Sequence, residues 1–277
     1  MQTTSSVAVL GLGIIGSTWA RHLEQDGVLS AAWNRTPQPA FPQWVDTPAA
    51  ALGRADTVIL VVADPPAVEG LLRTLAPRLE PRHLIIQSST IDPDSSRAFA
   101  ELVSARGAAY VEAPFTGSKP AAEQRQTIFY LGGAPEAVAR AQPVLARLSR
   151  QQWVIGSGTQ AATLKLACNL QIVTQLEALC EALAWSRQAG ISDAIFFDAL
   201  RTNAAWSGVI QLKEPKLRAG DYAPQFSIKH MLKDLRLALA SLPGQLPVVE
   251  TVAERLQAVQ DRGGANEDMS ALYRLLE

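Results

Sequence analysis

Three glycines with the spacing Gly-x-Gly-x-x-Gly constrain the fold of this chain more than any other feature of its sequence. Gly11, Gly13 and Gly16 directly follow the apolar run Val7–Leu10 and precede a helical pattern over Ser17–Gln25. Between a strand and a helix, the first glycine permits a tight turn, the second lets a pyrophosphate approach the backbone, and the third lets helix and strand pack closely. Free N–H groups at the helix start then bind phosphates. We therefore expect a dinucleotide to bind this turn. The candidate contacts are Gly11, Leu12, Gly13, Ile14, Ile15 and Gly16.

Two other interpretations of these glycines are weaker. A glycine-rich turn can serve packing alone, but a strand before it and a helix after it are the context that dinucleotide binding requires. A phosphate loop of the Walker type fits the spacing from Gly11 to Gly16, yet it needs a lysine where this chain has Ser17. The Walker interpretation is therefore excluded.

Short apolar runs alternate with helical patterns along the first half of the chain. This alternation is typical of a mostly parallel sheet with helices on both faces. Together with the glycine turn, it predicts an α/β protein whose residues 1–157 form an N-terminal Rossmann domain with a doubly wound sheet. The expected strands are Val7–Leu10, Leu29–Trp33, Thr57–Val62, Leu84–Gln87, Ala109–Glu112, Thr127–Leu131 and Trp153–Ile155.

From residue 158 onward the pattern becomes helical. A segment rich in Ala and Leu runs without Pro or Gly up to Gly190, which is the expected C-terminal cap of one long helix. We therefore expect residues 158–277 to form an all-helical domain for substrate binding and dimerisation. Its further predicted helices are Ser192–Arg201, Ile228–Ala240, Val248–Asp261 and Met269–Leu276.

The end of the second predicted strand indicates which dinucleotide binds. An NAD site usually has a carboxylate there for the ribose 2′-hydroxyl, whereas this chain has Asn34, Arg35 and Thr36. Asp26 comes too early to serve, and Arg35 can pair with a 2′-phosphate. The pattern favours NADP, with NAD as the alternative. Arg35 could instead stack on adenine or point into solvent.

The composition excludes several classes of partner. Hydrophobic residues make up 48% of the chain and charged residues 18%, and the formal net charge is −1, so no strong field attracts nucleic acid or an anionic membrane. No apolar stretch reaches the roughly 18 residues of a membrane span. The segment Met1–Ser6 lacks the basic and apolar regions of a signal peptide, so we expect a cytoplasmic protein. Cys168 and Cys180 are expected to be core residues on one helix.

Hydride transfer to a carbonyl needs a group that protonates the developing alkoxide. None of the four tyrosines begins a Tyr-x-x-x-Lys pair, and the three histidines form no zinc-ligand pattern with the two cysteines, so we expect no metal. Lys165 and Asn169 lie four residues apart on the predicted long helix and therefore project from the same face. Their neighbours are mostly alanine and leucine. A single helix lysine is, however, also compatible with a solvated surface.

Five sequence motifs stand in one order along the chain. They are GLGIIG at Gly11–Gly16, SST at Ser88–Thr90, EAPFTGSKPAAE at Glu112–Glu123, GTQAATLKLACN at Gly158–Asn169 and FSIKHMLKDLRLAL at Phe226–Leu239. With these motifs the chain resembles the β-hydroxyacid dehydrogenase family, which includes 3-hydroxyisobutyrate dehydrogenase and the glyoxylate and succinic semialdehyde reductases. The resemblance implies a C-terminal domain like that of 6-phosphogluconate dehydrogenase.

The resemblance also implies roles for individual residues. Lys165 would be the catalytic proton donor, and Asn169 would support it. The substrate carboxylate would be held by Thr116, Gly117 and Ser118. The alternative from the residues alone is that Pro114–Pro120 is merely a loop.

Further roles are implied in the other motifs. Thr90 would lie near the nicotinamide and its ribose, and Lys233 near the cofactor. Asp234 would help to orient Lys165, and Phe226 would wall the substrate pocket. By themselves these residues could equally be a helix cap, a solvated charged face and core.

The third motif is more similar to the glyoxylate and succinic semialdehyde reductase branch, although Thr116 stands where the family usually has serine. We therefore expect NADPH-dependent reduction of a short aldehyde acid to the hydroxy acid. The alternatives are an imine reductase, in which the catalytic lysine is usually replaced, and a non-catalytic dinucleotide sensor. The family further implies a homodimer or homotetramer.

Overall fold

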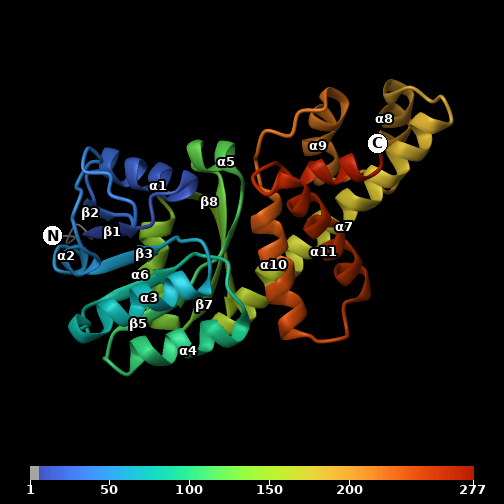
Figure 1. Ribbon diagram of the computed structural model, residues 1–277. Coiled ribbons are helices and arrows are strands. Elements are labelled where there is room, and N and C mark those ends of the chain that lie inside the picture. Colours follow the sequence, from blue (N-terminus) through green and yellow to red (C-terminus); the bar gives the residue numbers. More distant parts are fainter. Residues whose placement is uncertain (1–5) are drawn as a thin grey trace. The chain divides into compact units, whose positions relative to one another are not determined.

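A computed structural model describes residues 6–277 of the chain (Figure 1). The chain divides into two compact units, one that ends at Lys165 and one that begins at Leu166. Helix α7, Gly158–Gln188, belongs partly to each unit. The division therefore differs from the expected domain ranges 1–157 and 158–277, which place the whole helix in the second domain and stay a prediction.

The first unit is built on one sheet of eight strands in the order β2-β1-β3-β4-β5-β7-β6, with β8 paired to β7. The strands β1 to β5 run parallel, and β7 lies antiparallel to β5 and β6. The predicted mostly parallel sheet is confirmed. The strands are β1 Val7–Leu10, β2 Leu29–Trp33, β3 Thr57–Leu60, β4 Leu84–Gln87, β5 Ala109–Glu112, β6 Phe115–Thr116, β7 Thr127–Gly133 and β8 Ser149–Gly156.

Helices connect the strands and begin at clear capping signals. Asp64 and Asp92 each accept a hydrogen bond from a backbone N–H in the first turn of the next helix, and a proline follows each of them at the first helical position. The helices of this unit are α1 Ile14–Gln25, α2 Pro48–Leu52, α3 Pro65–Leu75, α4 Pro93–Ser104, α5 Lys119–Glu123 and α6 Pro135–Leu145, with a short 3₁₀ turn at Ala76–Arg78.

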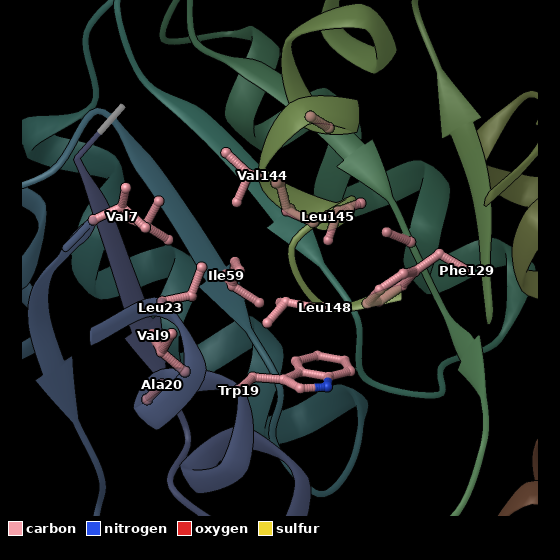
Figure 2. Close-up of a cluster of buried hydrophobic side chains, with 14 of the residues drawn as sticks. Val7, Val9, Trp19, Ala20, Leu23, Ile59, Phe129, Val144, Leu145 and Leu148 are labelled. Carbon is pink, nitrogen blue, oxygen red and sulfur yellow. The ribbon is translucent and has the colours of Figure 1, made fainter. Parts of the chain in front are cut away.

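Both faces of the sheet are buried at the parallel strands β1, β3 and β4, whose successive side chains point to opposite faces and are all buried. Val7 and Val9 of β1 pack with α1 and α6, around Trp19 and Phe129 (Figure 2). Ala8 and Leu10 of the same strand pack with α2, α3 and α4. This two-sided burial explains why these three strands are almost continuously apolar.

The second unit is helical. After α7 it contains α8 Asp193–Arg201, α9 Gly208–Ala219, α10 Ile228–Ser241 and α11 Pro247–Val259, followed by a short π-helical segment Gln260–Gly264 and a 3₁₀ helix Met269–Leu275. Gly190 follows α7 with φ +77°, and the Ser192 side chain caps α8. The helices share one apolar core, to which α7, α8, α10 and α11 all contribute. Within residues 6–277, no helix is both long and apolar enough to span a membrane.

The structure corrects the sequence expectations at several elements. Helix α9 was not expected, because Pro215 and several charged residues interrupt its pattern, yet Ile210 and Leu217 are buried and hold it in place. The last helix is 3₁₀ rather than α. The segment Pro114–Pro120 is no mere loop, because it contains the short strand β6.

Candidate functional site

The glycine turn has the geometry that its spacing implies. Gly11 has φ +109°, and a Cβ there would lie 2.2 Å from the Val61 carbonyl oxygen. A Cβ at Gly16 would lie 1.9 Å from the Gly11 carbonyl oxygen, so α1 packs directly on the turn. Gly13 is exposed and has open space around the position of its missing Cβ. The turn therefore leaves one side of its backbone open to an anion, which fits a dinucleotide pyrophosphate.

The residues after β2 have two different environments. Asn34 accepts a hydrogen bond from the backbone N–H of Leu12 through Oδ1, at 3.0 Å, and donates one to the Thr36 carbonyl, at 3.0 Å. It therefore ties the end of β2 to the glycine turn. Arg35 and Thr36 are exposed beside it. Whether these residues contact a cofactor stays a prediction.

Asp26 is engaged elsewhere. Arg125 donates to both of its carboxylate oxygens, at 2.8 and 3.0 Å. This hydrogen-bonded pairing lowers the pKa of Asp26 although partial burial opposes it. The interaction links the C-terminus of α1 to the residues after α5, so Asp26 has a structural partner in Arg125.

The segment expected to hold a carboxylate is a short edge strand followed by a turn. Thr116 ends β6, which pairs with β7 through Thr116 and Ile128. Gly117 has φ +127°, a conformation that favours glycine. Ser118 precedes α5, but its hydroxyl makes no capping hydrogen bond. Lys119 is exposed and pairs with Glu123 at 3.7 Å.

Lys165 is buried, contrary to the solvated alternative. Its residue is 9% exposed, and its Nζ lies 5.9 Å from the centroid of the Phe115 ring. Phe115 precedes Thr116 on β6 and packs edge-on against Trp19, with ring centroids 4.8 Å apart. The first unit thus brings the candidate proton donor close to the segment that begins at Thr116.

In the second unit, Asn169 and Asp234 form a buried pair. Both are 2% exposed, and the Asn169 Nδ2 donates to Asp234 Oδ2 at 2.6 Å. Lys233 Nζ lies 2.8 Å from Asp234 Oδ1. Asp234 therefore fixes the Asn169 amide, and the Lys233–Asp234 pair is not a simple solvated face. Among residues 6–277 there is no group of three or more His, Cys, Asp or Glu that could hold a metal ion.

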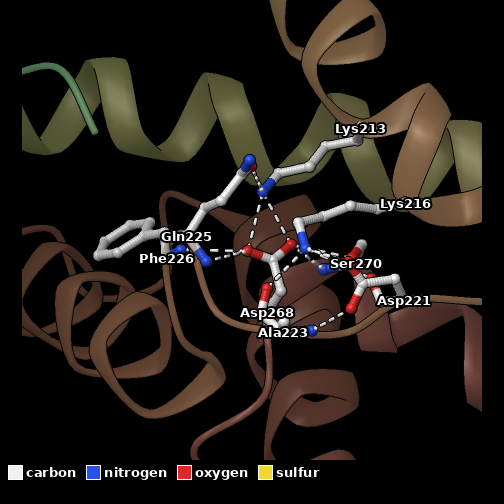
Figure 3. Close-up of polar contacts among 8 residues, drawn as sticks. All are labelled: Lys213, Lys216, Asp221, Ala223, Gln225, Phe226, Asp268 and Ser270. Atoms are coloured by element: carbon white, nitrogen blue, oxygen red, sulfur yellow. Dashed lines mark hydrogen bonds and ion pairs between the residues drawn. The ribbon is translucent and has the colours of Figure 1, made fainter. Parts of the chain in front are cut away.

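Phe226 is half-buried against the core of the second unit. Its backbone N–H donates to Asp268, whose carboxylate also pairs with Lys213 at 2.7 Å (Figure 3). The Asp268 and Lys213 side chains are 0% and 1% exposed. Burial on its own raises the pKa of Asp268, but Lys213 and the backbone donors outweigh it, so that the pKa is lowered. This buried pair holds the backbone that carries Phe226, and no sequence pattern indicated it.

Glu112 is a further residue that no sequence pattern indicated. It ends β5, is fully buried, and lies within 2.8 Å of the Gln87 Nε2 and 2.7 Å of the Tyr110 hydroxyl. Burial raises the pKa of its carboxyl to about 8, because desolvation outweighs these hydrogen bonds. A glutamate at the end of an apolar strand was the available signal.

Comparison with known families matches the chain along almost its whole length. Residues 6–156 match the model described as the NAD binding domain of 6-phosphogluconate dehydrogenase. Residues 158–276 match the model described as NAD-binding of NADP-dependent 3-hydroxyisobutyrate dehydrogenase.

Individual proteins are similar over the full chain. An uncharacterized oxidoreductase of Synechocystis is 31% identical over 98% of this chain and 97% of its own length. Glyoxylate/succinic semialdehyde reductase 1 of Arabidopsis thaliana is 27% identical, with 98% of each chain covered. The solved structure of Mycobacterium tuberculosis 3-hydroxyisobutyrate dehydrogenase with L-serine has a TM-score of 0.90 at 23% identity, covering 99% of this chain and 100% of the other, and shows the same fold.

Proposed function

We propose that this chain reduces a short aldehyde acid to the hydroxy acid with NADPH. The chain belongs to the β-hydroxyacid dehydrogenase family of NAD(P)-dependent oxidoreductases. The family establishes an enzyme that binds NAD(P) and acts on CH–OH groups. The substrate class, the preference for NADPH and the residue roles are the proposed part. Glyoxylate and succinic semialdehyde are the model substrates, because the Arabidopsis relative is named for them.

The burial of Lys165 is the observation that carries the proposal. The Lys165 residue is 9% exposed and its Nζ lies beside an aromatic ring, so the ammonium group is placed in a site with little contact to bulk water, where a general acid can act on a bound substrate. Bound NADPH supplies the hydride that reduces the aldehyde carbon. Lys165 Nζ donates the proton that the resulting alkoxide needs. Asn169 acts as the positioning residue, because its amide is fixed by Asp234.

The other end of the substrate is proposed to bind beside β6. The backbone N–H groups of Gly117 and Ser118 and the hydroxyls of Thr116 and Ser118 form a set of neutral donors suited to a carboxylate. The Ser118 hydroxyl makes no capping hydrogen bond at the start of α5, which supports this role. Thr116 carries a methyl group that serine lacks, which narrows the space beside the carboxylate and favours small substrates.

Cofactor contacts are proposed along the carboxyl edge of the sheet. The open backbone at Gly13 would receive the pyrophosphate, and the exposed Arg35 would pair with the 2′-phosphate of NADPH. Thr90 and Lys233 are the candidates near the nicotinamide end. The remaining candidates around the turn are Gly11, Leu12, Ile14, Ile15, Gly16, Asn34 and Thr36.

We also propose that the chain forms a homodimer or homotetramer. Large apolar side chains of the second unit are exposed, with Trp185 at 77% and Ile195 at 64%, and a second copy of the chain would cover them. Light scattering that gives the mass of one chain would refute this proposal.

The function is tested by following oxidation of NADPH, with NADH in parallel, against glyoxylate, succinic semialdehyde, methylglyoxal, tartronate semialdehyde and a cyclic imine. We expect turnover with an aldehyde acid and a higher kcat/KM with NADPH. Turnover of the cyclic imine, with no turnover of any aldehyde acid, would instead identify an imine reductase. Tight binding of NADPH without turnover of any compound would favour a dinucleotide sensor.

A further inference from the structure

The buried carboxyl of Glu112 belongs to a hydrogen-bonded network that none of the roles above uses. Gln87 donates through Nε2 to Glu112 Oε1 and to the Ser89 carbonyl, each at 2.8 Å, and its Oε1 accepts from the Ser89 N–H at 2.6 Å. The two bonds to Ser89 fix which way the Gln87 amide points. The remaining Nε2 hydrogen therefore faces Glu112.

The network continues from strand to strand along the carboxyl ends of the sheet. Ser89 accepts a hydrogen bond from the Val62 N–H through its hydroxyl, at 2.8 Å. The neighbouring Val61 is the residue against which Gly11 and Gly16 pack. Because β5, β4, β3 and β1 are adjacent in the sheet, these contacts tie Glu112 through the Ser88–Thr90 segment to the glycine turn.

Glu112 also lies beneath the start of α7. A Cβ at Gly158 would lie 3.2 Å from the Glu112 Cβ and 2.9 Å from the Ser96 Oγ, so a larger residue at this point would have to displace its neighbours. Gly158 is the first residue of the helix that carries Lys165 two turns later. One buried carboxyl thus contacts the elements that lead to both the proposed cofactor site and the proposed proton donor.

The groups around this carboxyl are neutral or negative. Burial is the largest influence on its pKa and raises it, and Asp92 at the cap of α4 adds to this effect. Hydrogen bonds from Tyr110, Ser96 and Gln87 lower the pKa by less, and none of these groups is a cation. Glu112 accepts from Gln87 Nε2 at Oε1 and from the Tyr110 hydroxyl at Oε2. Both hydrogen bonds lower its pKa, but burial outweighs them. An ionised Glu112 would be a buried charge without a counter-ion, which a site of this kind tolerates poorly.

We propose that Glu112, in its uncharged form, is a positioning residue that holds the Ser88–Thr90 segment for the nicotinamide end of the cofactor. This inference rests on the proposed function, because it takes Thr90 as a cofactor contact. Loss of the Glu112 proton leaves a buried charge, which gains stability by moving toward water and away from Gln87. This movement releases the hydrogen bonds by which Gln87 holds Ser89 and weakens cofactor binding. The pKa of about 8 puts this change just above neutral pH.

The size of the effect follows from population arithmetic. If only the protein with neutral Glu112 binds NADPH, the dissociation constant rises in inverse proportion to the neutral fraction. With a pKa of about 8, that fraction is near one at pH 7 and about one in eleven at pH 9. The affinity should therefore fall about tenfold between these pH values. The 2′-phosphate of NADPH contributes little, because its second ionisation, with a pKa of about 6, is nearly complete at pH 7.

The test is a fluorescence titration of NADPH binding between pH 7 and pH 9 with the full-length protein. Glu112→Gln keeps an acceptor for Gln87 and is uncharged at every pH, so we expect it to bind NADPH as the original protein does at pH 7 and to retain that affinity at pH 9. Glu177→Gln is the matched control, because burial also raises the pKa of Glu177, which lies in the second unit beside Arg255. This control should keep the tenfold pH dependence.

Infrared spectroscopy of the cofactor-free protein provides a second readout. A neutral carboxylic acid band should disappear with rising pH around 8 and be missing in Glu112→Gln. Constant affinity of the original protein from pH 7 to 9, or an unchanged pH dependence in Glu112→Gln, would overturn the inference while leaving the reductase proposal intact. If NADPH binding shows the expected dependence on Glu112 but the protein reduces none of the aldehyde acids, only the substrate proposal is refuted. The absence of NADPH binding at any pH would refute both.

Discussion

Replacing Gly16 and Gly13 separately by alanine should have opposite consequences, although both glycines belong to the same motif. At Gly16 the new methyl would lie 1.9 Å from the Gly11 carbonyl oxygen and 2.7 Å from Val61 Cγ1. Ordinary contact begins near 3.4 Å, so the carbonyl would have to move by about 1.5 Å. It cannot move freely, because Gly11 itself is pressed against the Val61 carbonyl.

We expect Gly16→Ala to destabilise the protein by about 3 kcal/mol, the upper part of the range for overpacking. In urea this lowers the unfolding midpoint by roughly 1 M or more. Gly13→Ala adds a methyl to open space at φ −71°, so stability should stay the same or rise by about 0.4–1 kcal/mol. Its affinity for NADPH should nevertheless fall, because the methyl takes the place of the approaching pyrophosphate.

Urea unfolding followed by circular dichroism and NADPH titration of both variants measure the two effects. Equal stability of Gly16→Ala and the original protein would refute the packing argument. Full NADPH affinity in Gly13→Ala would refute the place assigned to the pyrophosphate.

Three further predictions concern charged residues. Lys213→Met leaves Asp268 as a buried charge without its cation and should lower the free energy of unfolding in urea by about 3–5 kcal/mol. Lys119→Met removes an exposed pair and should leave the unfolding midpoint unchanged. Equal midpoints for both variants would contradict this prediction. The pKa of Asp26 lies below its ordinary value of 3.8, so the contribution of this carboxylate to stability is present above that pH and is lost as the pH falls through the lowered pKa. The stability of Asp26→Asn should therefore depend less on pH below pH 3.8. An acid unfolding curve parallel to that of the original protein would speak against this prediction. Arg35→Ala should raise the KM for NADPH about tenfold, as expected for a lost hydrogen bond to a charged group, without changing the KM for NADH. An equal change for both cofactors would refute the assignment of Arg35 to the 2′-phosphate.

Much of the fold was predictable because local signals agree with the tertiary structure. The glycine spacing, the apolar strands and the capping residues each specify a short segment, and the strands β1, β2, β4 and β5 begin and end at the expected residues. Helix α9 was missed because its stability comes from buried side chains, while its own sequence contains Pro215. Local propensity gives no information about such burial.

In the candidate site, too, local contacts were predictable from the sequence and long-range contacts were not. Lys165 and Asn169 could be paired from sequence, since four residues on a helix fix their common face. The contacts of Gln87 with Glu112 and of Lys213 with Asp268 join residues 25 and 55 positions apart, so only the folded chain brings them together. Asn34 illustrates a third case, because the predicted cofactor residue also fixes Leu12 of the turn through its amide.

The measurement that tests the central claim most directly is single-turnover reduction of an aldehyde acid by Lys165→Ala with saturating NADPH. We expect a loss of rate of at least about 100-fold, the effect of a missing general acid, while the NADPH dissociation constant measured separately stays unchanged. An unchanged rate of reduction with bound NADPH would contradict the assignment of Lys165 as the proton donor.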